Sequence, residues 1–296
     1  MVFELMDQNL YDLISGRREH LDQELVRRLG YQLFTALAHM HGKGIFHRDI
    51  KPENVLCDAT GETLKLADLG SCRSINTKTP MTEYIATRWY RSPECLLTDG
   101  HYGPEMDIWG AGCVLFEVTA LFPLFPGADE VDQVKIYKVV GSPTPSVLAK
   151  LKEKGSSKIN YSFPSMTGIG IRHFIPHASS DCVDLLNSTM IYDHKERIVA
   201  QDSVDHQYFS KLHEKEKKPS IRRNARVEDA KQAPVPKESL TTKQDTKKVT
   251  DSSDNKLSRR TIKVRNSNQA NSNQADSKLN NLKVRTRIIF YIFSVF

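Results

Sequence analysis

The eight residues HRDIKPEN at positions 47–54 combine three basic side chains, two acidic ones and an amide, with apolar residues on both sides. Phosphoryl transfer needs such a set: a carboxylate to orient an attacking hydroxyl, a cation beside the moving phosphate, and oxygen ligands for Mg²⁺. In that chemistry Asp49 accepts the hydroxyl proton, Lys51 lies at the γ-phosphate and Asn54 binds one Mg²⁺. A second Mg²⁺ ligand should lie nearby, and Asp68 opens the tripeptide DLG.

Hydrophobic periodicity predicts the elements around these residues. Apolar residues recur at helical spacing over 21–41, which predicts a helix that stops at the glycines before the charged loop. Short strands are predicted at Leu56 and over 63–66. Residues 71–104 show little periodicity and are predicted to form an ordered loop, whereas the strongly apolar segment 105–121 predicts a buried helix.

The rest of the chain up to residue 209 is predicted to be helical in short pieces. Proline and glycine interrupt 123–175, where only short helices are expected, and closing helices are predicted over 181–190 and 203–209.

The composition changes near Ser210. Of the 42 Lys+Arg and 36 Asp+Glu in the 296 residues, 21 and 9 lie in 210–296, which gives this tail a net charge of +12 and leaves the body at −6. Lys, Ser, Asn, Gln and Asp dominate the tail, so it cannot bury enough apolar area to offset its ordering entropy, and we expect it to be disordered. Its basic charge would suit nucleic acid or an anionic membrane, but a solvated linker is the better explanation.

Cysteine usage and the chain ends give broad constraints. The five cysteines include no CxxC pair, which favours free thiols in a reducing compartment. The first residues, MVFELMDQNL, lack the features of a signal peptide, and the apolar last nine residues, IIFYIFSVF, are too few to span a bilayer. We therefore expect neither a leader nor a transmembrane segment.

Further motifs follow HRD and DLG in a fixed order. They are SPE at 92–94, Asp107 within DIWGAG, and Arg197. An isolated HRD would be explained by chance, but in this order and spacing residues 1–209 resemble the C-terminal lobe of a eukaryotic protein kinase. The resemblance implies an α+β protein-kinase-like fold, mainly α-helical in this lobe, with a short β-hairpin region. It also implies ATP and Mg²⁺ as cofactors and proteins as substrates.

The resemblance can be narrowed to a subgroup. Lys51, two residues after Asp49, and Thr87, before Arg-Trp-Tyr, are typical of the serine/threonine-specific form, so Thr87 is included among the catalytic candidates. TEY followed by ATRWYRSPE, and the insert after LFPG, resemble mitogen-activated protein kinases within the CMGC group. GSCRS at 70–74 and TEYIATRWYRSPECLLTDG at 82–100 resemble one branch of these kinases.

This subgroup implies activation by phosphorylation of Thr82 and Tyr84, carried out by an upstream kinase. A phosphate brings close to two negative charges, which guanidinium groups can pair. The candidates are Arg48 and Arg73 for phospho-Thr82, and Arg88 and Arg91 for phospho-Tyr84. Such pairs would order the loop and fix Asp49. The alternative is that these arginines only solvate a loop. Arg91 is also implied to favour proline after the acceptor Ser/Thr.

Other residues are implied to form the scaffold. Glu94 and Arg197 should form a buried ion pair, and Asp107 should hold the HRD backbone from the buried helix. His47 and Leu69 are expected to pack in the interior rather than take part in the chemistry.

The first residues resemble the end of a strand and the hinge between kinase lobes. Met6 would bind adenine through its backbone, with Glu4 beside it in the hinge. Asn9 stands where relatives often have an acid for the ribose, and Leu56 completes the nucleotide site.

A kinase nucleotide site also needs a Gly-rich loop and a strand lysine, and the sequence motifs include neither. The first lysine is Lys43, beside the catalytic loop, and the GxG at 168–170 lies in the insert, so the Gly-rich loop and strand lysine of a kinase nucleotide site are not seen before the catalytic loop. We therefore expect a C-lobe without the N-lobe sheet, impaired in ATP binding. Two alternatives remain, a catalytically inactive binding module and a defective product.

The resemblance also implies how the protein behaves in the cell. We expect a monomer that contacts protein substrates and an activating kinase, with no specific nucleic acid. Relatives act in the cytoplasm and nucleus, and some act at cilia.

Overall fold

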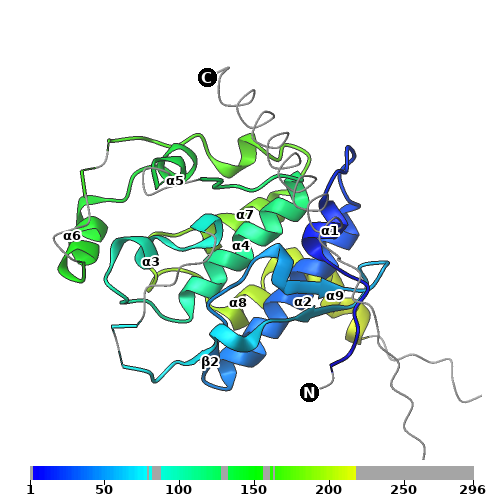
Figure 1. Ribbon diagram of the computed structural model, residues 1–296. Coiled ribbons are helices and arrows are strands. Elements are labelled where there is room, and N and C mark those ends of the chain that lie inside the picture. The colour runs from blue at the N-terminus through cyan, green and yellow to red at the C-terminus, as the bar shows by residue number, and fades with distance from the viewer. Residues whose placement is uncertain are drawn as a thin grey trace, which may run out of the picture. The chain divides into compact units, whose positions relative to one another are not determined.

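A computed structural model describes residues 3–78, 80–81, 88–127, 133–155, 161–162 and 164–217 (Figure 1). The chain divides into two units, Met1–Lys218 and Pro219–Phe296. The second unit lies outside the described residues, and so does the disorder predicted for it.

The described part is mainly helical, as the sequence predicts. The helices are α1 (Leu10–Ile14), α2 (Gln23–Gly42), α3 (Pro93–Leu97), α4 (Glu105–Ala120), α5 (Gln133–Val140), α6 (Pro145–Glu153), α7 (Ser180–Thr189), α8 (Ala200–Val204) and α9 (Ser210–Lys217). Single 3-10 turns are η1 (Pro52–Asn54), η2 (Leu69–Ser71), η3 (Arg88–Tyr90), η5 (Ile171–His173) and η6 (Gln207–Phe209). The predicted helix over 21–41 is confirmed by α2, which starts where the Asp22 carboxylate accepts the backbone N–H groups of Glu24 and Leu25.

Two small antiparallel sheets carry the loops between these helices. β1 (Gln8–Asn9), β3 (Val55–Cys57) and β4 (Leu64–Leu66) form one sheet in the order β1-β3-β4, and β3–β4 is the predicted hairpin. β2 (Ile45–Phe46) pairs with β5 (Arg73–Ser74) in the other. The charged loop thus leaves β2 and returns through η1 into β3.

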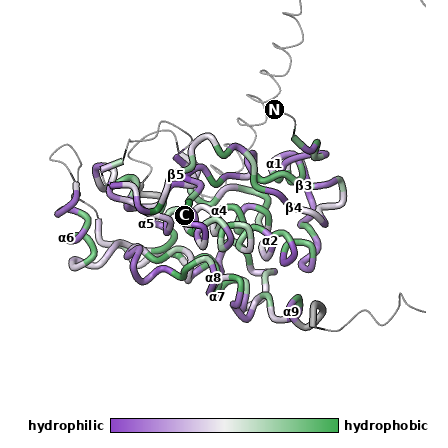
Figure 2. The backbone as a smooth tube through the Cα atoms, turned by 90° about the horizontal axis from the view of Figure 1, so that it is seen from below, coloured by the Kyte–Doolittle hydropathy of each residue, from purple (hydrophilic) through white to green (hydrophobic). Residues whose placement is uncertain are grey.

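Helix α4 forms the centre of the core and confirms the predicted buried helix. Every residue from Met106 to Ala120 is buried, and α2 and α7 pack against it. Two glycines make this packing close: a Cβ on Gly110 would lie 3.0 Å from the Ile50 side chain, and one on Gly112 would lie 2.2 Å from the Thr189 hydroxyl. Figures 1 and 2 show α4 among the other helices, with α6 at the edge on the side away from α1. The charged loop therefore rests directly on the α4 backbone.

Three predictions about the elements need correction. The segment 71–104 is not wholly loop, because it contains β5, η3 and α3, elements of two to five residues that are too short to show a period. The closing helix over 203–209 is instead α8 followed by η6. Residues 210–217 belong to helix α9 rather than to an irregular tail.

No helix in the described ranges has both the length and the apolar character needed to cross a bilayer.

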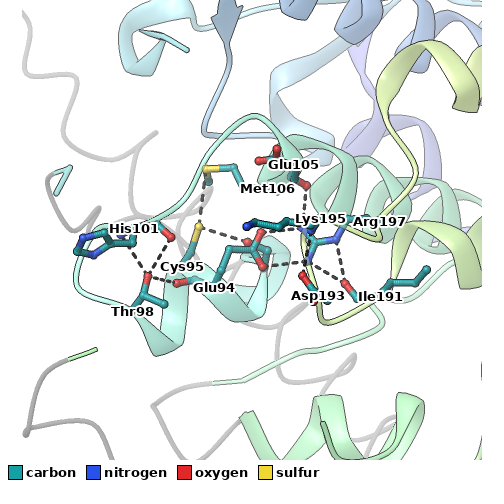
Figure 3. Close-up of polar contacts among 11 residues, drawn as sticks. Glu94, Cys95, Thr98, His101, Glu105, Met106, Ile191, Asp193, Lys195 and Arg197 are labelled. Carbon is teal, nitrogen blue, oxygen red and sulfur yellow. Dashed lines mark hydrogen bonds and ion pairs between the residues drawn. The ribbon is translucent and has the colours of Figure 1, made fainter. Parts of the chain in front are cut away.

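A buried ion pair ties α3 to the segment after α7 and confirms the predicted Glu94–Arg197 contact (Figure 3). The Arg197 guanidinium donates to both Glu94 carboxylate oxygens, at 2.7 and 2.9 Å, and both side chains are almost fully buried. Arg197 also donates to the carbonyls of Ile191 and Glu105, the first residue of α4. One cation therefore holds three segments of the chain together.

Replacing Arg197 by methionine should lower the free energy of unfolding by about 3–5 kcal/mol, because Glu94 would stay buried without its cation. Chemical denaturation measures this cost. The double variant Glu94→Leu/Arg197→Met should lose less than Arg197→Met alone, since it leaves no unpaired charge. The control is Lys65→Met, which breaks the pair with Glu4, exposed on both sides, and should change stability little. Equal losses in the two single variants would contradict this account.

The ion pair also predicts a pH dependence. Burial alone would raise the pKa of Glu94, but Arg197 holds that pKa below its ordinary value of 4.5. A carboxyl with a lowered pKa in the folded state stabilises the fold above its unfolded pKa and loses this contribution as pH falls through the folded pKa. Between about pH 5 and about pH 3, the wild type should lose more free energy of unfolding than Glu94→Gln. A larger loss in Glu94→Gln would refute the assignment.

Candidate active site

Three of the predicted catalytic side chains meet on the loop between β2 and β3. The Lys51 ammonium donates to the Asp49 carboxylate at 2.7 Å. The Asn54 amide nitrogen donates to the carboxylate and to the backbone carbonyl of the same Asp49, at 2.9 and 2.8 Å. Asp49 and Asn54 are buried, so their geometry is fixed by packing as well as by hydrogen bonds. Asp49 is thus an oriented carboxylate with a cation beside it.

The backbone of this loop is held by Asp107, as predicted. The two Asp107 carboxylate oxygens accept the backbone N–H groups of His47, at 2.7 Å, and Arg48, at 2.8 Å. His41, near the end of α2, contacts the same carboxylate at 3.0 Å. Since Asp107 lies in the first turn of α4, the buried helix and α2 together fix the start of the catalytic loop.

Arg48 has a backbone conformation that needs such support. Its φ is +75°, in the left-handed region that is costly for residues with a Cβ. His47 braces the same turn, because its Nδ1 accepts the N–H of Asp49 at 3.3 Å and its Nε2 donates to the carbonyl of Ala67 at 2.9 Å. Hydrogen bonds on both sides of Arg48 therefore offset the cost of this backbone conformation. The left-handed turn at Arg48 directs Asp49 toward Asn54.

Asp68, the second predicted Mg²⁺ ligand, reaches the loop through its neighbour. The Ala67 N–H donates to the carbonyl of Asn54 at 2.9 Å, and Asp68 follows with a left-handed φ of +59° and an exposed side chain. Because the Asn54 amide nitrogen is used on Asp49, its oxygen is the atom left for a cation. The described residues contain no cluster of three or more His, Cys, Asp or Glu side chains suited to a metal. One carboxylate and one amide oxygen suit Mg²⁺, which binds few protein ligands and keeps waters and phosphates.

Two of the residues predicted for the nucleotide lie on neighbouring strands of the three-stranded sheet. Asn9 on β1 is the register partner of Leu56 on β3, so these two are brought together. The Asn9 carboxamide oxygen accepts the N–H of Asp12 and caps α1, which fixes its orientation. Glu4 forms an exposed ion pair with Lys65, and Met6 is half-buried.

The four arginines predicted to pair phosphates differ in their surroundings. Arg48 is buried and donates to the carbonyl of Ser71 and to the hydroxyl of Tyr102, whereas Arg73 is exposed and donates to the carbonyl of Cys72. Arg88 is exposed on η3, and burial lowers the pKa of half-buried Arg91. Thr82, Tyr84 and Thr87 lie outside the described residues. Their predicted roles and the pairing of their phosphates therefore stay predictions.

The expectation for Leu69 is wrong, whereas His47 is buried as expected. Leu69 starts the 3-10 turn η2, which has no buried residue, and its side chain is 60% exposed. An apolar residue type alone did not distinguish the two environments.

Sequence reasoning missed three residues that support the site. Tyr102 binds Arg48, His41 binds Asp107, and Glu117 accepts a hydrogen bond from the hydroxyl of buried Tyr90 at 2.7 Å. Burial and the neighbouring Glu117 carboxylate raise the pKa of Tyr90 well above its ordinary value. The signal available for Tyr102 was weak: a buried tyrosine needs a partner for its hydroxyl, but the sequence does not say which one.

Comparisons with known proteins assign most of the described part of the chain to one family. The family described as "Protein kinase domain" matches residues 1–209. Human "MAPK/MAK/MRK overlapping kinase" is 48% identical over 219 residues, which cover 74% of this chain and 51% of that protein. The mouse protein of the same name is 49% identical over 210 residues, with 71% of this chain and 49% of that protein covered.

More distant relatives carry a related description. Mouse "Serine/threonine-protein kinase MAK" is 39% identical over 209 residues, which cover 70% of this chain and 33% of that protein. The chain therefore spans about half the length of the overlapping kinases that it matches, and a third of the latter relative. The matched region includes the HRD loop, the DLG turn, α3 and α4, so the resemblance drawn from these motifs is confirmed, and the chain belongs to the protein kinase family.

Proposed function

We propose that this chain supplies the catalytic loop and the Mg²⁺ ligands of a MAP-kinase-like serine/threonine protein kinase. The observation that carries the proposal is the Asp49 carboxylate, fixed by Lys51 and Asn54 at 2.7–2.9 Å on a loop braced by Asp107. A carboxylate in this setting can orient an acceptor hydroxyl, which is the main task that phosphoryl transfer leaves to a side chain.

The reaction follows from these positions. The acceptor serine or threonine oxygen forms a bond to the γ-phosphorus of ATP while the bond from that phosphorus to the oxygen of the ADP leaving group breaks. Asp49 accepts the hydroxyl proton, and Lys51 offsets negative charge on the transferred group. Mg²⁺ held by Asn54 and Asp68 would neutralise the phosphates, and Asn9, Leu56 and the hinge at Glu4 and Met6 would hold the nucleoside.

Regulation by phosphorylation is part of the same proposal. An upstream kinase would phosphorylate Thr82 and Tyr84. The phosphate on Thr82 would pair with the guanidinium groups of Arg48 and Arg73. The phosphate on Tyr84 would pair with those of Arg88 and Arg91. Buried Arg48 directly precedes Asp49, so a charge that moves Arg48 also moves the carboxylate. Arg91 would favour substrates with proline after the acceptor. We also propose that the kinase acts on protein substrates as a monomer, and that it acts in the cytoplasm, nucleus or cilium.

A second candidate function is a protein-binding module that transfers nothing. It is favoured by three exposed apolar side chains, Phe3 (79%), Leu5 (95%) and Leu69 (60%), since exposed apolar surface often marks an interaction site. Such a module would present Thr82 and Tyr84 to an upstream kinase without using Asp49.

A phosphotransfer assay with Mg·ATP and a generic basic protein should distinguish these functions. Asp49→Ala should lower the transfer rate of the chain by about 100-fold or more, because it removes the general base. Asp202→Ala, an exposed aspartate in α8, is the control and should leave the rate unchanged.

Two results would count against the kinase proposal. Transfer that survives Asp49→Ala would mean that the activity comes from elsewhere. No transfer by a wild-type chain that melts cooperatively and is phosphorylated at Thr82 or Tyr84 by a MAP-kinase kinase would support the binding module instead.

A further inference from the structure

Arg48 is hydrogen-bonded to Tyr102, a residue that has no part in the proposed reaction. Its guanidinium donates to the Tyr102 hydroxyl at 2.7 Å and to the carbonyl of Ser71 at 3.1 Å, and it lies 5.6 Å from the Tyr102 ring centroid. Both Arg48 and Tyr102 are buried. A hydrogen bond to a charged group inside the protein is among the stronger ones, so this contact restricts the side chain just before Asp49.

Tyr102 belongs to a small core of its own. Phe46, Tyr102 and Met106 form a buried cluster apart from the main core, and Ile75, Met81 and Cys95 pack against it. Phe46 precedes the catalytic loop, and Met106 lies in the first turn of α4 beside Asp107. Tyr102 therefore contacts the structures on which the position of Asp49 depends.

The segment 73–81, of which the structure describes every residue but 79, is tied to this small core at both ends. At its start, β5 pairs with β2, and the N–H of Ile75 donates to the carbonyl of Gly44 at 2.8 Å. At its end, the N–H of Met81 donates to the carbonyl of Gly100 at 2.9 Å. Gly100 has a φ of +72°, and a Cβ there would lie 2.1 Å from the Met81 carbonyl oxygen, so this close approach requires glycine.

We propose that Tyr102 is a positioning residue that couples the segment 73–81 to Asp49 through its hydrogen bond to Arg48. A shift of this segment moves Ile75 or Met81 and so repacks the ring of Tyr102. The hydroxyl then releases or tightens Arg48, whose strained backbone sets the direction of Asp49. The effect on transfer rests on the proposed kinase function, whereas the effect on the loop does not.

Tyr102→Phe tests the hydrogen bond while keeping the ring in its core. The matched control is Tyr192→Phe, which removes a hydroxyl that also donates at 2.7 Å, to the carbonyl of Gly141 away from the loop. Amide hydrogen exchange of the peptide 45–51 should be about tenfold faster in Tyr102→Phe and unchanged in Tyr192→Phe. In a transfer assay, kcat should fall about tenfold in Tyr102→Phe with the KM for ATP unchanged.

A second pair of variants tests the coupling from the other end. Gly100→Ala should displace Met81 and speed exchange over both 73–81 and 45–51. Gly16→Ala is the control, because Gly16 has a similar φ of +74° and no atom within 4 Å of the added Cβ. It should share the backbone strain but leave both peptides unchanged. This pair also decides the question if Tyr102→Phe does not fold.

The results separate the coupling from the kinase proposal. If the wild type transfers no phosphate, the proposed function fails, and the exchange data still decide the role of Tyr102. Exchange over 45–51 that is the same in Tyr102→Phe as in the wild type would overturn the inference. So would Gly100→Ala that disturbs 73–81 but not 45–51, or equal effects of Tyr102→Phe and Tyr192→Phe on 45–51.

Discussion

Two consecutive backbone N–H groups, those of His47 and Arg48, donate to the two oxygens of one buried carboxylate, Asp107. Such a pair of charge-assisted hydrogen bonds can hold a backbone in a conformation that it would not adopt alone. Here it offsets the left-handed φ of Arg48 and turns Asp49 toward Lys51 and Asn54. An asparagine in place of Asp107 would offer only one acceptor oxygen to the two N–H donors. The orientation of the Asp49 carboxylate therefore originates in helix α4, through Asp107.

The rest of the fold can be understood as what brings Asp107 to that point. Helix α4 is buried along almost its whole length, so its direction is set by the helices packed around it. Gly110 lets the catalytic loop approach the α4 backbone, since a Cβ would lie 3.0 Å from the Ile50 side chain. Arg197 fixes the start of α4 by binding the carbonyl of Glu105, and it joins that end to α3 through Glu94. The scaffold ion pair and the catalytic loop thus depend on the same turn of one helix.

Much of the site could be predicted from the sequence, and what could not be predicted has a common cause. The Glu94–Arg197 pair and the grip of Asp107 on the loop follow from motifs whose residues have fixed roles in the family. Tyr102, which is 54 residues from Arg48, belongs to no such motif, and only the folded chain shows the contact. Periodicity predicted α2, and continuous apolar character predicted α4, because both helices are long. Neither signal could resolve β5 or α3, which have two and five residues. Leu69 was misjudged because its exposure depends on the turn that carries it, not on its apolar side chain.

The Asp107 carboxylate sets the direction of Asp49 through the backbone of His47 and Arg48. A crystal structure of the Asp107→Asn variant tests it most directly, because an asparagine keeps the size of the side chain but removes one acceptor oxygen. The account predicts that Arg48 leaves the left-handed region and that Asp49 separates from the Asn54 amide, while α4 and the Glu94–Arg197 pair stay in place. An unchanged φ at Arg48, with Asp49 still bound by Asn54, would contradict it.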